Sequence, residues 1–294
     1  MDSNTAILLE TLGARLGRPL NFDSAAAGGC ISASFTARAG SEKVFIKTGD
    51  ATRLAMFEAE ADGLKALALA GTHRVPAVLS TGEAEGSAYL ALEWLDLTPM
   101  ASKEDAVAAG HALAELHRHT GNRYGWQRDN FIGATPQANP ESDSWPFFFA
   151  RQRLLPQLAL ATQNGNPKEL IRDGERLADA VPALLFDYRP APSLLHGDLW
   201  HGNTAMVDGR PALFDPAVYH GDREADLAMS ELFGGFPGAF YLAYREAFPL
   251  DHRFEQWKNL YNLYHILNHL NLFGRSYLGQ AQRMIKRLLA EARS

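Results

Sequence analysis

Three polar residues in one short stretch of the sequence have the types and the spacing that phosphoryl transfer requires. Asp198 and Asn203 stand in the order Asp-x-x-x-x-Asn, in which the acid accepts the proton of a substrate hydroxyl and the amide binds magnesium. Asp208-Gly209 then predicts a tight turn, and the resulting hairpin would return Asp215 to the side of Asn203. Such oxygen ligands suit Mg²⁺, whose other ligands are water and ATP phosphates. We therefore predict Asp198 as the catalytic base and Asn203 and Asp215 as metal ligands.

The first hundred residues must supply a cation that holds the phosphates. Lys47 ends the apolar run Val44-Phe45-Ile46, as the strand lysine of nucleotide-dependent kinases does. The next helix offers Glu58 and Glu60 as partners for the lysine. These two acids point about 200° apart on a helix, so only one of them can face Lys47. We favour Glu60, because related kinases share its spacing to the leucines that follow.

A glycine turn and a hinge strand complete the predicted nucleotide site. Gly28 and Gly29 stand between two predicted strands, where small residues let backbone N–H groups approach a phosphate. Cys30 follows them directly, and the same N–H dipoles would favour its thiolate form. We hypothesise that oxidation of Cys30 blocks ATP binding or links two chains. The backbone groups that would meet adenine belong to Glu93, Trp94 and Leu95.

The elements that must position these residues change in kind near residue 95. Up to that point the patterns predict an opening helix and a small antiparallel sheet with one inserted helix. Beyond it, apolar residues recur at helical spacing, with two further helices after Asp226. We predict a bilobal α+β, protein-kinase-like fold. Residues 1–95 would form the ATP-binding lobe, and residues 96–294 the mainly α-helical lobe for catalysis and substrate binding.

The composition narrows the classes of partner. The 294 residues carry a net charge of −6 with no long run of like charges, which argues against nucleic acid or a membrane surface as a partner. The sequence shows no secretory signal pattern and no stretch of about 18 apolar residues, so we expect a cytoplasmic protein. The single cysteine excludes an intrachain disulfide. We expect a monomer, with a redox-linked dimer through Cys30 as the alternative.

Two motifs point to a particular family. The stretch His196 to Asn203, HGDLWHGN, and the stretch Asp215 to Phe236, which ends in ELFGGF, resemble the fructosamine kinase (ketosamine 3-kinase) family. This family lies within the larger aminoglycoside and choline kinase-like group, and the likeness runs over most of the chain. Trp200 and the ELFGGFP segment are its narrower signature. The resemblance implies ATP- and Mg²⁺-dependent phosphorylation of O-3 of a ketoamine on an amine or a protein lysine, a step in deglycation.

The resemblance also implies roles for single residues. It makes Trp200 a wall of the sugar site. Asp226 could bind substrate, but in kinases of this group the equivalent acid braces the catalytic loop, and we favour that role. Asp222 and Glu224 could bind substrate by drawing in a cationic amine, although acids are also common at the start of a helix for dipole reasons. The roles carried over within the motifs are those of Asp198 as base, Asn203 and Asp215 as metal ligands, Lys47 and Glu60 as the phosphate-positioning pair, and residues 93–95 as the hinge.

Three alternatives stay open. An aminoglycoside or other small-amine kinase would share the ATP site and differ in its substrate pocket. A ribulosamine kinase would differ only in the length of the sugar that it accepts. An inactive nucleotide-binding adaptor is expected to lack at least one of the four polar residues of the motifs. All four are present: Lys47, Asp198, Asn203 and Asp215.

Overall fold

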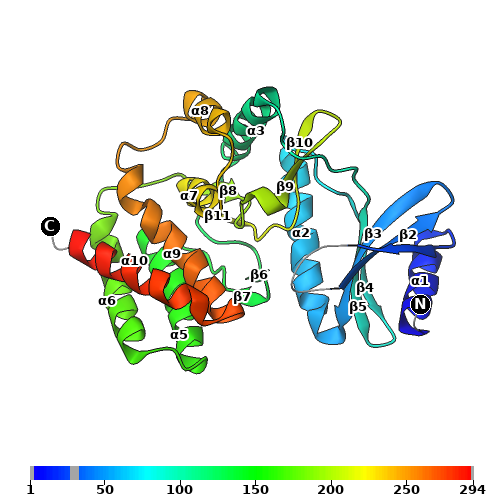
Figure 1. Cartoon of the computed structure of the whole chain (residues 1–294), viewed down its shortest axis with the longest axis horizontal. Helices are drawn as coiled ribbons and strands as arrows, with labels where there is room; N and C mark the ends of the chain where they lie inside the picture. The colour runs from blue at the N-terminus through cyan, green and yellow to red at the C-terminus, as the bar shows by residue number, and fades with distance from the viewer. Residues whose placement is uncertain (1–2, 27–32, 293–294) are drawn as a thin grey trace. The chain divides into compact units, whose positions relative to one another are not determined.

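The computed structural model describes residues 3–26 and 33–292. The chain divides into two compact units. The first comprises Met1–Met100 and Ala205–Pro216, and the second comprises Ala101–Thr204 and Ala217–Ser294. A five-stranded sheet dominates the first unit and helices dominate the second (Figure 1). The mixed α+β character predicted from the sequence is therefore present.

The sheet of the first unit is antiparallel throughout, in the strand order β1-β2-β3-β5-β4. Helix α1 covers one side and helix α2 the other (Figure 1). The elements are α1 (Ser3–Leu16), β1 (Asn21–Ala25), β2 (Ala33–Ala39), β3 (Glu42–Asp50), α2 (Leu54–Ala70), β4 (Val78–Ala84) and β5 (Ser87–Glu93).

The alternation of side chains along β3 decides where Lys47 points. Val44 and Ile46 are fully buried in an apolar cluster with Leu8 and Leu12 of α1. Because successive side chains of a strand point to opposite faces, Lys47 lies on the other face, the one that α2 covers. A shift of one residue in the register of β3 would place the lysine in the apolar cluster instead.

A hairpin from the middle of the chain belongs to the first unit. It consists of β9 (Thr204–Val207) and β10 (Arg210–Leu213), joined through Asp208 and Gly209, both with positive φ, as a two-residue hairpin turn requires. Main-chain bonds join Thr98 to Met206 and Arg74 to the β10 strand. The prediction of two sequential lobes with a boundary at 95–96 did not foresee this return, because isolated bridges of this kind leave no periodic pattern in the sequence.

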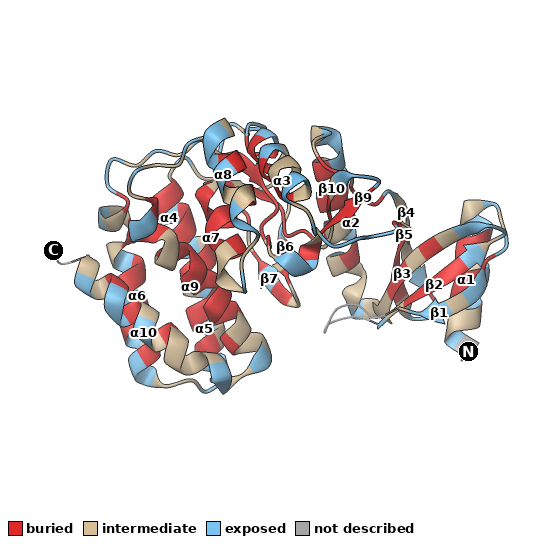
Figure 2. Ribbon diagram, turned by 45° about the horizontal axis from the view of Figure 1, so that its top comes forward, coloured by how far each residue is buried: buried red, intermediate tan, exposed pale blue. Residues whose placement is uncertain are grey.

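The second unit is mainly helical, and its helix α9 is buried around most of its circumference (Figure 2). Two short strand pairs, β8 with β11 and β6 with β7, lie among the helices. The helices are α3 (Lys103–Leu116), α4 (Trp145–Phe149), α5 (Leu155–Gln163), α6 (Lys168–Leu184), α7 (Glu224–Leu232), α8 (Gly238–Ala247), α9 (Phe254–Phe273) and α10 (Leu278–Glu291). The strands are β6 (Asn130–Ile132), β7 (Thr135–Gln137), β8 (Ser193–Leu195) and β11 (Tyr219–Gly221).

Two details of the helices differ from the sequence prediction. Within residues 33–292, three helices rather than two follow the helix that contains Asp226, because Gly274, with φ 89°, ends α9 before α10 begins. A π-helical turn at Ala150–Leu154 separates α4 from α5, which the apolar spacing of the sequence alone does not predict. Pro156 lies just after this turn and has no N–H to donate to the preceding turn of the helix.

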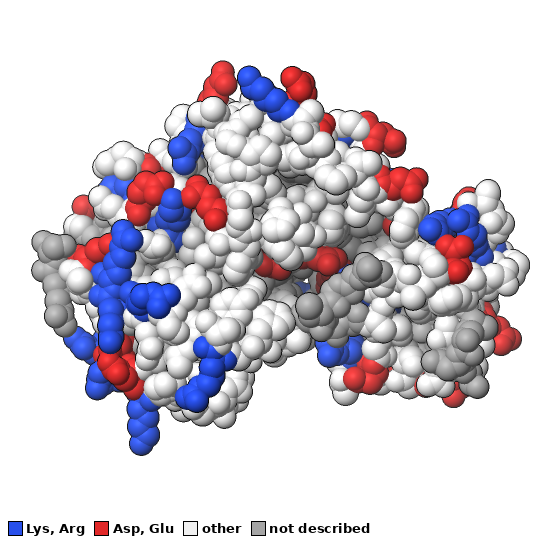
Figure 3. All heavy atoms as spheres, in the orientation of Figure 1, with Lys and Arg blue, Asp and Glu red and all other residues white. Residues whose placement is uncertain are grey.

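Among the described residues, no helix is both long and apolar enough to cross a membrane. On the face of the second unit that Figure 3 shows, basic and acidic side chains are intermingled.

Candidate functional site

In the first unit, Lys47 bridges two carboxylates. Its Nζ atom donates to Glu60 Oε1 and to Asp215 Oδ1, each at 2.6 Å. Burial alone would lower the pKa of Lys47, but the charges of Asp215 and Glu60 outweigh it and raise the pKa above its ordinary value. The lysine is therefore a permanent cation, as a phosphate-binding group must be.

Helix α2 presents Glu60, and not Glu58, to the lysine. Glu58 is exposed, whereas the Glu60 side chain is mostly buried at 13% exposure. Burial raises the pKa of Glu60, and Lys47 opposes this rise by favouring the ionised carboxylate. The apolar residues Phe57, Leu64 and Leu67 bury the face of α2 that carries it.

The hairpin presents Asp215 to the same lysine. Asp215 follows β10 by two residues and has a positive φ of 54°, a conformation that aspartate tolerates better than most residues. Its side chain keeps 43% exposure, so the carboxylate can still reach a ligand. Carboxylate oxygens of this kind suit Mg²⁺. The described part of the first unit thus brings together three of the residues predicted from the sequence: Lys47, Glu60 and Asp215.

In the second unit, the loop after β8 is held by its backbone. Asp226, which is buried in α7, accepts hydrogen bonds from His196 N at 2.7 Å and Gly197 N at 2.9 Å. Although burial raises its pKa, bonds and charges from His117 and the loop prevail and lower it, so Asp226 stays ionised. The predicted bracing of the loop by Asp226 is confirmed.

Glycine is required at the turn of this loop. Gly197 has φ 82°, and a Cβ atom there would lie 2.0 Å from the carbonyl oxygen of Ala217. The close approach is part of the loop's support, since Ala217 N donates to His196 O at 2.9 Å. The backbone that carries Asp198 is thus fixed on both sides.

Asp198 and Asn203 contact each other directly. Asn203 Nδ2 donates to the carbonyl oxygen of Asp198 at 2.9 Å and to its carboxylate Oδ2 at 3.1 Å. These bonds use the amide nitrogen, and the amide oxygen is the atom that binds metal ions. The donor set therefore fits the predicted pairing of a base with a magnesium ligand.

Trp200 lies in the same loop, between these two residues, and is partly exposed. Its ring is 4.8 Å from the ring of His201 and 6.4 Å from that of Phe233 between centroids. The ring also lies over Gly202, where a Cβ atom would come within 2.4 Å of it. Gly202 therefore allows the indole its present position in this loop.

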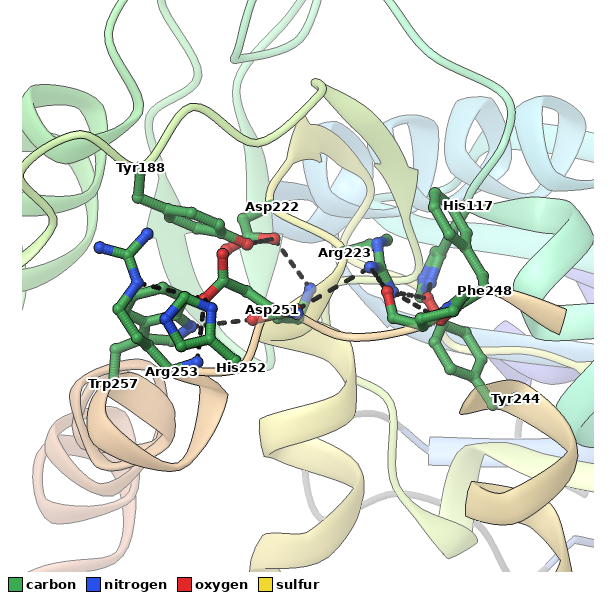
Figure 4. A network of polar contacts seen from close by, with 12 residues as sticks. His117, Tyr188, Asp222, Arg223, Tyr244, Phe248, Asp251, His252, Arg253 and Trp257 are labelled. Atoms are coloured by element: carbon green, nitrogen blue, oxygen red, sulfur yellow. Dashed lines mark hydrogen bonds and ion pairs between the residues drawn. The ribbon is translucent and has the colours of Figure 1, made fainter. Parts of the chain in front are cut away.

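Asp222 and Glu224 are fully buried, which differs from the expectation that they draw an amine in from solvent. Asp222 accepts bonds from Tyr261 Oη at 2.5 Å and Tyr188 Oη at 3.2 Å, and Glu224 accepts one from Trp257 Nε1 at 2.9 Å. Figure 4 shows Tyr188 lying against Asp222. Through these bonds the two acids connect the start of α7 to α9 inside the unit.

Burial also raises the pKa values of Asp222 and Glu224, which favours their protonated, neutral forms. Burial and the neighbouring charge of Glu224 raise the pKa of Asp222 to about 7, and burial raises that of Glu224 as well. Arg223 lies between them in the sequence but points the other way, over the ring of Phe248 and onto Tyr244 Oη at 3.0 Å (Figure 4).

The predicted hinge residues all belong to the first unit. Glu93 N donates to Ala77 O at 2.8 Å, so this N–H is already used within the unit. Leu95 is buried against Val207 and Ala212 of the hairpin. Trp94 Nε1 donates to Asp96, and Lys43 lies over the indole ring at 4.1 Å. The remaining predicted nucleotide contacts, Gly28, Gly29 and Cys30, lie outside the described residues.

Sequence reasoning missed one residue beside these groups, Arg74, which contacts both the hinge strand and the hairpin. Its position between a helix and a strand gave no motif that could reveal it. His117 belongs to none of the motifs noted in the sequence, and its ring nitrogens contact Asp226 Oδ2 at 3.3 Å and Tyr244 Oη at 2.8 Å.

The fold of this chain is similar to that of a solved kinase-like phosphotransferase. The crystal structure of the aminoglycoside phosphotransferase APH(4)-Ia superimposes with a TM-score of 0.63, covering 98% of each chain at 15% identity. The antiparallel sheet of one unit and the helices of the other are the elements of this kinase-like fold. The predicted fold class is confirmed.

The particular family follows from closer similarity. The sequence model of the fructosamine kinase family matches residues 8–291, so this chain belongs to that family. A probable ketoamine kinase of Synechocystis sp. is 48% identical over 265 residues, which cover 89% of this chain and 88% of that one. A chloroplastic protein-ribulosamine 3-kinase of Oryza sativa subsp. indica is 38% identical over 266 residues, covering 89% and 77%.

A solved structure agrees. A crystal structure from Haemophilus somnus 129PT, provisionally assigned as a fructosamine-3-kinase, has a TM-score of 0.88 at 30% identity and covers 97% of each chain. The resemblance noted in the sequence is confirmed. Membership of a kinase family makes this chain a phosphotransferase that uses a nucleotide.

Proposed function

We propose that the protein transfers the γ-phosphoryl group of ATP to O-3 of a ketoamine, such as a fructosamine or ribulosamine on a free amine or a protein lysine. The observation that carries the proposal is the presence of both polar sets, Lys47 with its two acids and Asp198 with its amide, in a chain of the fructosamine kinase family. An inactive adaptor of this family is expected to have lost part of one set.

Lys47 and Glu60 position the nucleotide. The buried ammonium group pairs with phosphate oxygens, and Glu60 keeps it from turning fully toward Asp215. Asp215 and Asn203 are the ligands for Mg²⁺, which when bound neutralises the charge of the phosphates and orients them. Residues 93–95 contact adenine through their backbone, as in the hinge of related folds.

Asp198 accepts the proton of the sugar hydroxyl as that oxygen attacks phosphorus. The bonds from Asn203 Nδ2 orient its carboxylate, and the braced backbone of the loop holds it in place. Phosphoryl transfer asks the protein mainly for such positioning and charge neutralisation. The partly exposed indole of Trp200 is the surface on which the sugar stacks.

A ribulosamine is the second candidate substrate, because the rice relative is named a protein-ribulosamine 3-kinase. The two sugars differ by one carbon.

The test is ATP turnover on a panel of acceptors with the purified full-length protein. Fructosyl-lysine and ribulosyl-lysine are compared with a small aminoglycoside and with free lysine, following ADP release and the phosphorylated product by ³¹P NMR. We expect Mg²⁺-dependent phosphorylation of at least one ketoamine and none of the aminoglycoside. Turnover of the aminoglycoside alone would replace the proposal by an amine-antibiotic kinase, and turnover of nothing would favour the adaptor.

A further inference from the structure

Arg74 lies in the connection between α2 and β4 and is bonded through its main chain to the hairpin that carries Asp215. Its N–H donates to Pro211 O at 2.8 Å, and its carbonyl oxygen accepts from Leu213 N at 3.0 Å. The two bonds form a parallel bridge with β10. Leu213 is two residues before Asp215, so Arg74 fixes the backbone immediately before the proposed metal ligand.

The side chain of Arg74 is bonded to the other end of the proposed nucleotide site. Its Nη2 atom forms an ion pair with Glu93 Oε1, and its Nη1 atom donates to Val75 O at 3.1 Å. Glu93 Oε2 in turn accepts from Ala77 N at 3.1 Å. Glu93 ends β5 and begins the hinge, so this ion pair fixes the strand end from which the hinge leaves.

An apolar contact reinforces the same connection. Leu95, two residues beyond Glu93, packs against Val207 and Ala212 of the hairpin. Ala212 is the residue of β10 that pairs with Arg74. The hinge and the hairpin are therefore joined twice, once by side-chain packing and once through Arg74.

We propose that Arg74 is a positioning residue that couples the hinge, where adenine binds, to Asp215, where the metal binds. The inference depends on the proposed function, because that function assigns the hinge to adenine and Asp215 to Mg²⁺. Arg74 fixes the distance between the hinge and Asp215. A nucleotide whose adenine binds at the hinge therefore has its phosphates at a defined distance from the metal ligand. Adenine and Mg²⁺ then each favour the binding of the other.

A purely stabilising role would have a different signature. The side chains of Arg74 and Glu93 are about a third exposed, at 32% and 34%, and ion pairs of this exposure add little to stability. Removing the pair should hardly move the melting temperature. A positioning role instead changes the factor by which Mg²⁺ tightens nucleotide binding, which a loss of stability alone leaves intact.

The experiment measures ADP binding to the full chain by calorimetry, with and without Mg²⁺. Arg74→Met removes the ion pair and keeps both main-chain bonds, since these need no side chain. Glu93→Gln removes the charge from the other partner and leaves Arg74 in place, in case Arg74→Met folds poorly. Arg38→Met is the matched control, because Arg38 forms an exposed ion pair with Asp23 on the same sheet.

In the wild type, Mg²⁺ should tighten ADP binding clearly. In Arg74→Met and in Glu93→Gln this factor should fall about fivefold or more, while the affinity for ADP without Mg²⁺ changes far less. The double variant should be no worse than either single variant, because both remove one interaction. Arg74→Lys should recover part of the factor, and Arg38→Met should keep it whole.

The proposal is overturned if Mg²⁺ tightens ADP binding in both Arg74→Met and Glu93→Gln as much as in the wild type. It is also overturned if Arg38→Met loses this effect equally, or if Mg²⁺ does not tighten ADP binding to the wild type. The acceptor panel decides the proposed function separately. A wild type that phosphorylates no ketoamine yet shows the expected Mg²⁺ factors would refute the substrate and leave the coupling by Arg74 supported.

Discussion

The two units hold their polar residues in place by different means. In the first unit, ion pairs hold the polar residues, because Lys47 lies between the carboxylates of Glu60 and Asp215. In the second unit, the backbone does it, because Asp226 and the tight turn at Gly197 fix the loop that carries Asp198. Ion pairs can exchange partners when a phosphate or a metal ion arrives, whereas a hydrogen-bonded loop cannot move without losing its support. The first arrangement suits binding of a charged nucleotide, and the second suits a base whose position must not change.

Replacing the proposed base should have the largest effect. Asp198→Asn removes the proposed proton acceptor but keeps the shape of the side chain, so kcat should fall about 10³-fold with ADP binding preserved. Steady-state kinetics and calorimetry on the same preparation check both halves of this prediction. Wild-type turnover in the variant would show that the fixed loop does not carry the base.

Lys47→Met should have the next largest effect, and it should act on the nucleotide. The variant loses the cation proposed to pair with the phosphates and leaves Glu60 and Asp215 without their shared partner, so kcat/KM for ATP should fall about 10²-fold. The measurement is the dependence of the initial rate on ATP at saturating ketoamine. If KM for ATP and kcat of the variant both matched the wild type, the charge of Lys47 would not be needed for the use of ATP.

Gly197→Ala probes the backbone of the second unit. The new methyl group meets the carbonyl oxygen of Ala217 at a positive φ, so the variant should be destabilised by about 3 kcal/mol. Gly40→Ala is the matched control, since Gly40 has a similar φ of 62°. Apart from Gly40 and its two chain neighbours, no atom of the described residues lies within 4 Å of where its methyl group would be. Thermal melts of the two variants should differ by several degrees. Equal melting temperatures would mean that φ strain alone, and not the contact with Ala217, matters at the loop.

The smallest effect is expected from pH at the buried acid Asp222. Burial raises its pKa from 3.8 to about 7 in the folded chain, so the folded state favours the protonated form. This stabilisation is complete below pH 4 and is lost as pH rises through 7. Asp222→Asn mimics the protonated acid, so relative to wild type it should gain about 2 kcal/mol of stability between pH 5 and pH 8. A difference between the two melting curves that stayed constant with pH would contradict the raised pKa.

Much of the fold followed from local patterns. The β-branched and aromatic run Val44-Phe45-Ile46 predicted a strand that ends in Lys47, and the Asp208-Gly209 pair predicted the hairpin turn. These features depend only on residues that are close together in the chain, so they can be predicted from a single sequence. The order of acid, amide and acid likewise predicted the polar sets that the structure contains.

What the sequence did not reveal depends on partners far apart in the chain. The burial of Asp222 and Glu224 results from Tyr188, Tyr261 and Trp257, whose positions no periodicity records. The contact of Arg74 with the hairpin joins residues more than a hundred positions apart through main-chain atoms, which carry no side-chain signature. For the same reason the membership of residues 205–216 in the first unit could not be read from the pattern of helices and strands.

The return of the hairpin has a consequence for how the protein is made. The ribosome finishes residues 1–100 long before it adds the strands that pair with Thr98 and Arg74, and residues 101–204 emerge in between. The first unit is therefore incomplete until translation has passed residue 216. Until then Leu95 lacks its apolar neighbours Val207 and Ala212. An early-stalled or truncated product would carry an unfinished surface, and a gene cut at residue 100 would not yield a self-sufficient nucleotide-binding half.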